Sequence, residues 1–192
     1  MPTTEAEGTD VLATERLTLR PVASQDLRAI VALAGDVEVA QWTVSIRHPL
    51  SEAEVKVWLA SRSAKGERAF AILLKGTGQL IGVVGITVLA DGDKAEIGYW
   101  IGRPYWGNGY ATEAVRRALL HGFGALGLAE VEATVFPGND RSIQVLTKIG
   151  FAETGSGRRD APSRGGDREV IVYTLTRADF ARIALSQAVG RE

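Results

Sequence analysis

Two glycines, Gly107 and Gly109, stand directly before a segment with helical spacing of apolar residues. The first four amides of a helix have no partner within the helix, and the helix dipole adds partial positive charge at this end. Glycine permits unusual backbone dihedral angles and lets an anion approach the backbone closely, so the segment predicts a pyrophosphate cradle that needs no lysine.

Two familiar nucleotide-binding motifs do not fit this segment. A P-loop ends in Gly-Lys-Ser or Gly-Lys-Thr, which is absent here. A dinucleotide-binding fold has Gly or Ala at the position of Thr112 and places its motif after the first strand of a parallel sheet, whereas antiparallel strands are predicted to come first in this chain. The remaining alternative is a glycine-rich connection that serves only the turn.

The flanking residues predict the elements that position this segment. Residues 94–101 alternate apolar with polar or small side chains, which is typical of a strand, and Glu96 is the carboxylate on it. Apolar spacing over residues 111–126 predicts the longest helix, with Gly127 as a candidate C-cap, and residues 131–135 alternate again. A strand, a helix and a strand in this order form a right-handed crossover whose two strands run parallel.

The rest of the chain predicts further strands and helices around this unit. Ser51 and Glu54 form a capping box for one helix, and Asn139 or Asp140 caps a short helix that Gly150 closes. The other predicted strands cover residues 16–22, 68–74, 80–89 and 169–175, and further helices begin at residues 27 and 176. Residues 155–167 are predicted to be a polar, Arg-rich loop.

Length and composition narrow the function classes. A chain of 192 residues fits one domain, and 22 Lys plus Arg against 23 Asp plus Glu give a net charge of -1, which provides no global field for nucleic acid or a membrane. The absence of cysteine excludes disulfides, thiolate metal sites and a cysteine acyl-enzyme, and no metal is expected. We expect a flexible tail over residues 1–13, a domain over residues 14–192 and a cytoplasmic location.

Three stretches together carry a family resemblance. Gly98-Tyr99-Trp100-Ile101 followed by residues 105–114 resembles motif A of the GCN5-related N-acetyltransferase (GNAT) superfamily. Two further stretches are similar to the Rim-type branch of this superfamily, which acts on ribosomal-protein N-termini. They are residues 137–142, running to Lys148-Ile149-Gly150-Phe151, and residues 14–21. The resemblance covers roughly residues 14 to 180. It implies an α/β (α+β) fold with one mixed, mostly antiparallel twisted sheet flanked by helices.

The resemblance also implies acetyl-coenzyme A as the cosubstrate and a primary amine as the acceptor. The cofactor would lie between the strand ending at Ile101 and the strand ending at Phe136, with Asn139 bonded to its pantetheine arm. Its pyrophosphate would bind the start of the predicted helix, where the implied cofactor-binding residues are Gly107, Asn108, Gly109, Tyr110 and Ala111, with Thr112 adding a hydroxyl. The family often has Gln or Arg at the position of Pro104, but backbone amides still bind phosphate there. Many members also have a Tyr at the position of Thr147 to protonate the departing thiolate, and that role is vacant here.

Two residues are implied as catalytic. In the Rim-type branch Ser142 replaces the missing Tyr; a serine is a poor acid, so its hydroxyl is either a hydrogen-bond donor to the thiolate or a structural helix residue. An amine must lose its proton before it attacks, and Glu96 is the best candidate base, acting directly or through water. The alternative for Glu96 is a solvated strand carboxylate. His48 is a second candidate base, and His121 is expected on a helix surface.

The acceptor remains open at this point. Candidate substrate-binding residues are Trp42, His48 and Arg158, in loops that would border the acceptor side. A protein N-terminal α-amine is the first hypothesis. A small amine such as an antibiotic, a polyamine or an amino-acid derivative is the second, and a non-catalytic acyl-coenzyme A-binding module is the third. The sequence also leaves a homodimer open.

Overall fold

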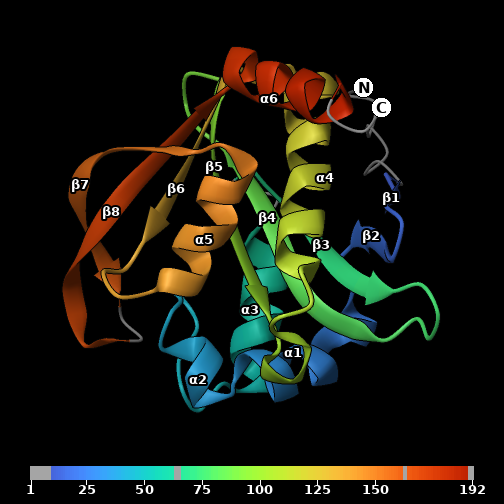
Figure 1. Ribbon diagram of the computed structural model, residues 1–192. Helices are drawn as coiled ribbons and strands as arrows, with labels where there is room; N and C mark the ends of the chain where they lie inside the picture. The colour runs from blue at the N-terminus through green and yellow to red at the C-terminus, as the bar shows by residue number, and fades with distance from the viewer. Residues whose placement is uncertain (1–9, 63–65, 162–163, 190–192) are drawn as a thin grey trace, which may run out of the picture.

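Eight strands between residues 12 and 176 pair into one central sheet (Figure 1). The computed structural model describes residues 10–62, 66–161 and 164–189. Helices α4 and α5 cover one face of the sheet, and α1 and α3 pack against the other (Figure 1). This confirms the α+β domain with a mixed, mostly antiparallel sheet flanked by helices.

The strands are β1 (Leu12–Ala13), β2 (Leu17–Pro21), β3 (Glu67–Leu74), β4 (Leu80–Val88), β5 (Lys94–Ile101), β6 (Glu130–Val135), β7 (Ala152–Ala161) and β8 (Gly166–Thr176). The helices are α1 (Leu27–Ala34), α2 (Val37–Ala40), α3 (Glu52–Ser61), α4 (Tyr110–Gly124), α5 (Asp140–Ile149) and α6 (Arg177–Val189). None of the helices in the described part of the chain is long and apolar enough to cross a membrane.

Strand order shows how the site-forming unit sits in the sheet. The order is β1-β2-β3-β4-β5-β6-β8-β7, and β5 with β6 is the parallel pair among otherwise antiparallel neighbours. Helix α4 connects these two strands and crosses the sheet (Figure 1). The predicted strand-helix-strand crossover is therefore present, and its two strands are direct neighbours.

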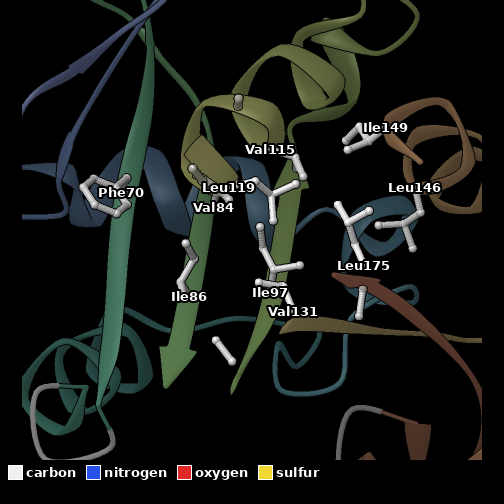
Figure 2. Packing of buried hydrophobic residues seen from close by; sticks show 14 of the residues in the cluster. Phe70, Val84, Ile86, Ile97, Val115, Leu119, Val131, Leu146, Ile149 and Leu175 are labelled. Carbon is white, nitrogen blue, oxygen red and sulfur yellow. The ribbon is translucent and has the colours of Figure 1, made fainter. Parts of the chain in front are cut away.

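Buried side chains from both the sheet and the helices fix this unit. Figure 2 shows Ile97 of β5 and Val131 of β6 beside Val115 and Leu119 of α4. Leu146 of α5 belongs to the same cluster. Full burial of such an aliphatic side chain contributes about 1.5–3 kcal/mol, so α4 and α5 are held firmly against β5 and β6. A rigid frame is what a binding site between these elements requires.

Local capping explains where the site-forming helices begin and end. Asn139 Oδ1 accepts a hydrogen bond from the Ser142 amide at 3.3 Å and caps α5. Gly150 ends the same helix with φ of 115°, a left-handed conformation that side chains disfavour. The Ser51–Glu54 capping box of α3 is also present, with both reciprocal hydrogen bonds. These three features match the sequence prediction.

Four details differ from the sequence prediction. Of residues 155–167, expected to be a loop, residues 155–161 and 166–167 lie in the paired strands β7 and β8, and residues 162–163 lie outside the described residues. Strand β7 is exposed along most of its length, so its sequence shows no apolar alternation. Helix α4 ends at Gly124, before Gly127. His121 is only 6% exposed instead of lying on the helix surface. Of the predicted N-terminal tail, residues 1–9 lie outside the described residues, and Leu12–Ala13 pair with β2.

Candidate functional site

The parallel pair β5–β6 separates soon after it begins. Its register runs only from Lys94 opposite Glu130 to Glu96 opposite Glu132. Beyond Glu96 the two strands diverge toward their carboxyl ends (Figure 1). A cavity of about 890 Å³ opens in this region and is lined from both strands. Unpaired backbone groups along diverging strands can bond a long, extended ligand.

The loop between β5 and α4 has the geometry of a phosphate cradle. Gly107 and Gly109 both have left-handed backbone angles, with φ of 78° and 76°. Gly109 is the N-cap of α4, so the first amides of the helix have no side-chain cap there. Gly107, Gly109, Tyr110, Ala111 and Thr112 line the cavity. The start of α4 therefore directs free amides and the positive end of the helix dipole at the cavity.

Asn108, which does not line the cavity, makes this loop rigid. Its side-chain amide donates to the carbonyls of Tyr105 and Trp106 at 3.1 and 3.0 Å. The Asn108 carbonyl accepts a hydrogen bond from Arg16 at 3.0 Å. Asn108 is thus a support for the loop, and its predicted role in binding the cofactor would run through the shape of the cradle.

An ion pair ties the first turn of α4 to Arg16, the residue just before strand β2. Arg16 Nη2 lies 2.7 Å from Glu113 Oε2, and Thr14 donates to the other carboxylate oxygen at 2.6 Å. Burial opposes ionisation of Glu113, but the hydrogen bonds from Thr14 and Arg16 outweigh it and lower the pKa of this carboxyl. The Arg16 guanidinium also stacks 4.7 Å above the Tyr110 ring. The first turn of α4 is therefore fixed from outside the cavity.

One face of α5 adds positive charge to the cavity wall. Arg141, Gln144, Val145 and Lys148 follow helical spacing and line the cavity. The Arg141 guanidinium lies 4.4 Å above the ring of Trp106, next to the glycine loop. Within the described residues, Arg141 and Lys148 are the cationic residues of the cavity lining. They are placed to attract an anionic ligand that lies against the start of α4.

Ser142 and Tyr99 meet on the α4 side of the cavity. The Tyr99 hydroxyl lies 2.8 Å from Ser142 Oγ and 3.3 Å from the Ser142 carbonyl. Burial raises the pKa of Tyr99, and the hydrogen bond to Ser142 only partly offsets this, so the phenol stays protonated. Tyr99, Asn139 and Ser142 all line the cavity. The sequence pattern predicted the strand that holds Tyr99 but did not pair this residue with Ser142.

Glu96 lies where β5 and β6 begin to diverge. Its side chain is 33% exposed and lines the cavity. Thr134 of β6 donates to Glu96 Oε1 at 3.0 Å, and Arg159 of β7 lies 3.2 Å from Oε2. Since side chains alternate along a strand, Glu96 faces the side of the sheet opposite to Tyr99. The cavity therefore joins a carboxylate on one face to a hydroxyl pair on the other.

The α1 and α3 side of the cavity is acidic and aromatic. Trp42, Trp58 and Trp100 line it together with Glu54 and Glu67. The Trp58 indole donates to both oxygens of Glu67, at 3.2 and 3.1 Å. Carboxylates and indole rings both attract ammonium groups. This end of the cavity can therefore bind an amine in its cationic form.

Two predicted acceptor residues lie outside this cavity. His48 is absent from the lining, and its Nδ1 lies 2.6 Å from the Gly35 carbonyl. Arg158 is exposed and forms an ion pair with Asp167 on the neighbouring strand. Trp42, the third candidate, does line the cavity and packs against Phe136. Ile101 lines it as well, and its carbonyl accepts a hydrogen bond from the Trp106 indole at 2.6 Å.

Several site residues escaped sequence reasoning for lack of a local signal. Glu67 and Trp58 meet only through the packing of α3 on β3, and Arg159 reaches Glu96 from a strand at the far edge of the sheet. For Arg141 and Lys148 a signal existed. They are seven residues apart on a short helix after a predicted phosphate cradle, and this spacing places both on one helix face.

The arrangement suits acetyl-coenzyme A when tested against its chemistry. A cofactor of this kind needs amides and cations for its phosphates, backbone groups for its amide-containing arm and a polar site for its sulfur. Left-handed Gly107 and Gly109 leave the amides of α4 accessible, and a Cβ at Gly107 would meet no protein atom within 4 Å. The class of protein that this arrangement defines is a coenzyme A-dependent acyltransferase.

The chain belongs to the GNAT family, because the family described as "Acetyltransferase (GNAT) domain" matches residues 16–152. The uncharacterized N-acetyltransferase p20 of Bacillus licheniformis is 32% identical over 176 residues, which cover 90% of this chain and 99% of that protein. The protein is thus an acetyl-coenzyme A-dependent N-acetyltransferase.

Solved structures of similar fold include two that contain coenzyme A or a derivative. Mycobacterium smegmatis RimJ in complex with CoA-disulfide has a TM-score of 0.77 and 26% identity, covering 88% of each chain. Spermidine N-acetyltransferase from Vibrio cholerae, in complex with CoA and spermine, has a TM-score of 0.75 and 23% identity, covering 88% of this chain and 99% of its own. The resemblance to the Rim-type branch agrees with the first of these.

Proposed function

We propose that this enzyme acetylates a primary amine by direct attack in a ternary complex, and that its acceptor is the α-amine of a protein N-terminus. The single observation that carries the transfer is the continuous cavity, which connects the glycine loop at α4 with Glu96 on the opposite face of the sheet. The N-terminal acceptor is supported by the Rim-type motifs and by the similarity to RimJ. An α-amine has a pKa near 8, so part of it is neutral at pH 7 and needs only modest help from a base.

The chain's own residues supply binding and proton transfer. The amides of residues 107 and 109–111 would hold the pyrophosphate, with Arg141 and Lys148 adding positive charge, and Asn139 would bond the pantetheine arm. When bound, acetyl-coenzyme A supplies an activated thioester. Glu96 would take the proton of the amine, directly or through one water, because its carboxylate lies at the fork of the two strands. Thr134 fixes one oxygen of that carboxylate.

A small polycationic amine is the second candidate acceptor. The carboxylates of Glu54, Glu67 and Glu96 line the cavity, and Glu67 contacts Trp58, whereas the described cations of the lining lie on α5. This separation of charge favours an acceptor with more than one ammonium group. The similar fold of a spermidine N-acetyltransferase is consistent with that reading. The third hypothesis, a module without turnover, is set aside because the chain belongs to an enzyme family.

A competition between acceptors tests the proposal. Thiol release from acetyl-coenzyme A would be measured with peptides that begin in Ser, Ala, Thr or Met, with the same peptides blocked at the N-terminus, and with diamines and polyamines. An N-terminal transferase acetylates the free peptides and leaves the blocked ones unchanged. Turnover restricted to polyamines would replace the first acceptor by the second. Release with none of these amines would contradict both.

A further inference from the structure

Ser142, the residue proposed to face the sulfur of coenzyme A, has a hydrogen-bond partner that lies outside its sequence motif. Ser142 Oγ makes one hydrogen bond within the described residues, to the Tyr99 hydroxyl at 2.8 Å. In a helix a serine hydroxyl commonly donates back to the carbonyl three or four residues earlier, but Ser142 has no such bond in the described structure. Its amide is held by Asn139 and its Oγ by Tyr99, so what remains to be set is the direction of the hydroxyl hydrogen.

The chemistry of the two hydroxyls decides which one donates. A phenol is a far stronger acid than an aliphatic hydroxyl, and the stronger acid is the better hydrogen-bond donor. The Tyr99 hydroxyl also lies nearer to Ser142 Oγ than to the Ser142 carbonyl, at 2.8 against 3.3 Å. Burial keeps Tyr99 protonated, as its raised pKa indicates, so its hydroxyl hydrogen is available for this bond.

We propose that Tyr99 is a positioning residue, which donates to Ser142 Oγ and so directs the Ser142 hydrogen into the cavity, toward the sulfur of coenzyme A. This inference rests on the proposed function, because it takes Ser142 as the group that faces the sulfur. Both side chains line the cavity on the α4 and α5 side of the sheet. Accepting a bond from Tyr99 also polarises the Ser142 hydroxyl and strengthens the bond that it donates.

The pair supplies a hydrogen bond and no proton. Neither Tyr99 nor Ser142 changes its protonation state in this arrangement, and the proton of the amine goes to Glu96. The thiolate charge is stabilised by one charge-assisted hydrogen bond from Ser142, whose orientation depends on Tyr99. Tyr99 therefore acts through Ser142, and the two side chains contribute as one unit.

The test compares binding of coenzyme A with binding of desulfo-coenzyme A, which lacks the sulfur. Calorimetry at pH 7 to 9.5 would give both affinities for the wild type, Tyr99→Phe, Ser142→Ala and the double variant. As the thiol ionises, the wild type should favour coenzyme A, and Ser142→Ala should reduce this preference by roughly 10- to 150-fold, the contribution of a hydrogen bond to a charge. Tyr99→Phe should reduce it by roughly 3- to 10-fold, and the double variant should match Ser142→Ala alone.

A matched control separates this effect from loss of a buried tyrosine hydroxyl in general. Tyr173 is also buried, on β8, and its hydroxyl donates to Glu153 at 3.3 Å, so Tyr173→Phe should leave the sulfur preference unchanged. An unaltered preference in a folded Tyr99→Phe enzyme that still binds coenzyme A overturns the inference alone. Additive losses in the double variant also overturn it, since Tyr99 would then act on the sulfur independently. A wild type that binds neither ligand overturns the proposed function and the inference together.

Discussion

Replacing Gly109 by Asp tests whether the start of α4 binds phosphate. Gly109 has φ of 76° and is the N-cap of the helix. Asp and Asn are the side chains that best tolerate this left-handed conformation, and both are good N-caps, so either variant should fold. A Cβ at this position would lie 3.6 Å from Arg16 Nη2, which is an ordinary contact. The Asp and Asn side chains have nearly the same shape, so their difference isolates the charge.

The expected size of the effect follows from Coulomb's law. A carboxylate about 5 Å from one phosphate charge costs about 1 kcal/mol in bulk water and about 3 kcal/mol at a protein surface. That corresponds to a loss of affinity of about 5- to 150-fold for each phosphate charge. Arg16 partly compensates the new charge, but Glu113 already neutralises that guanidinium, so the loss should remain measurable.

Calorimetry with acetyl-coenzyme A at two ionic strengths is the assay. Gly109→Asp should bind much more weakly than Gly109→Asn, and the gap between them should narrow as salt screens the charges. Circular dichroism and thermal unfolding would establish that both variants are folded. Equal affinities for the Asp and Asn variants would show that the phosphates lie elsewhere, and the assignment of the loop as the cradle would have to be abandoned.

Further predictions concern the base, the cofactor phosphates, the reaction order and acid stability. Glu96→Gln should lower turnover roughly 10²- to 10⁴-fold at pH 7 with little change in cofactor affinity. Raising the pH should increase the turnover of the variant more than that of the wild type, and equal turnover of the two enzymes from pH 6 to 9 would contradict the base role. Lys148→Met should weaken binding of acetyl-coenzyme A by up to about fivefold, as expected for an exposed ion pair with the pyrophosphate, and an unchanged affinity would exclude that contact. Initial-rate lines should intersect, whereas parallel lines or an acetylated enzyme would refute direct attack. Burial lowers the pKa of His121, so the unfolded chain binds more protons and the free energy of unfolding falls as the pH drops below about 6.5. His121→Leu should weaken this pH dependence in urea unfolding, and an unchanged pH dependence would assign it to other groups.

Sequence patterns correctly predicted those features of the fold that depend on interactions between residues close together in the chain. The Ser51–Glu54 capping box, the Asn139 cap and the left-handed Gly150 each involve residues within a few positions of one another. The parallel β5–β6 pair followed from the crossover rule. The divergence of these strands after Glu96 has no signature in a single strand, because it depends on how two strands twist relative to each other.

The contacts of the candidate catalytic residues needed the fold. Tyr99 and Ser142 are 43 positions apart and meet because α5 packs beside β5. Glu96 and Thr134 are 38 positions apart and meet because β6 runs parallel to β5, with Glu96 opposite Glu132. Neither contact produces periodicity or a motif, so only the resemblance could suggest roles for Glu96 and Ser142, and it could not name their partners.

The polar hairpin of β7 and β8 shows why a loop was predicted where a strand exists. Strand β7 is the outermost strand of the sheet, and most of its side chains are exposed, so burial imposes no alternation on its sequence. Polar and charged residues on such a strand also discourage pairing with another chain. The same polar composition allows Arg159 to reach the carboxylate of Glu96 at 3.2 Å. Arg159 is therefore one of the polar residues that remove the apolar alternation from β7, and it also places positive charge at the proposed base. Any acceptor ammonium that binds Glu96 must share that carboxylate with Arg159.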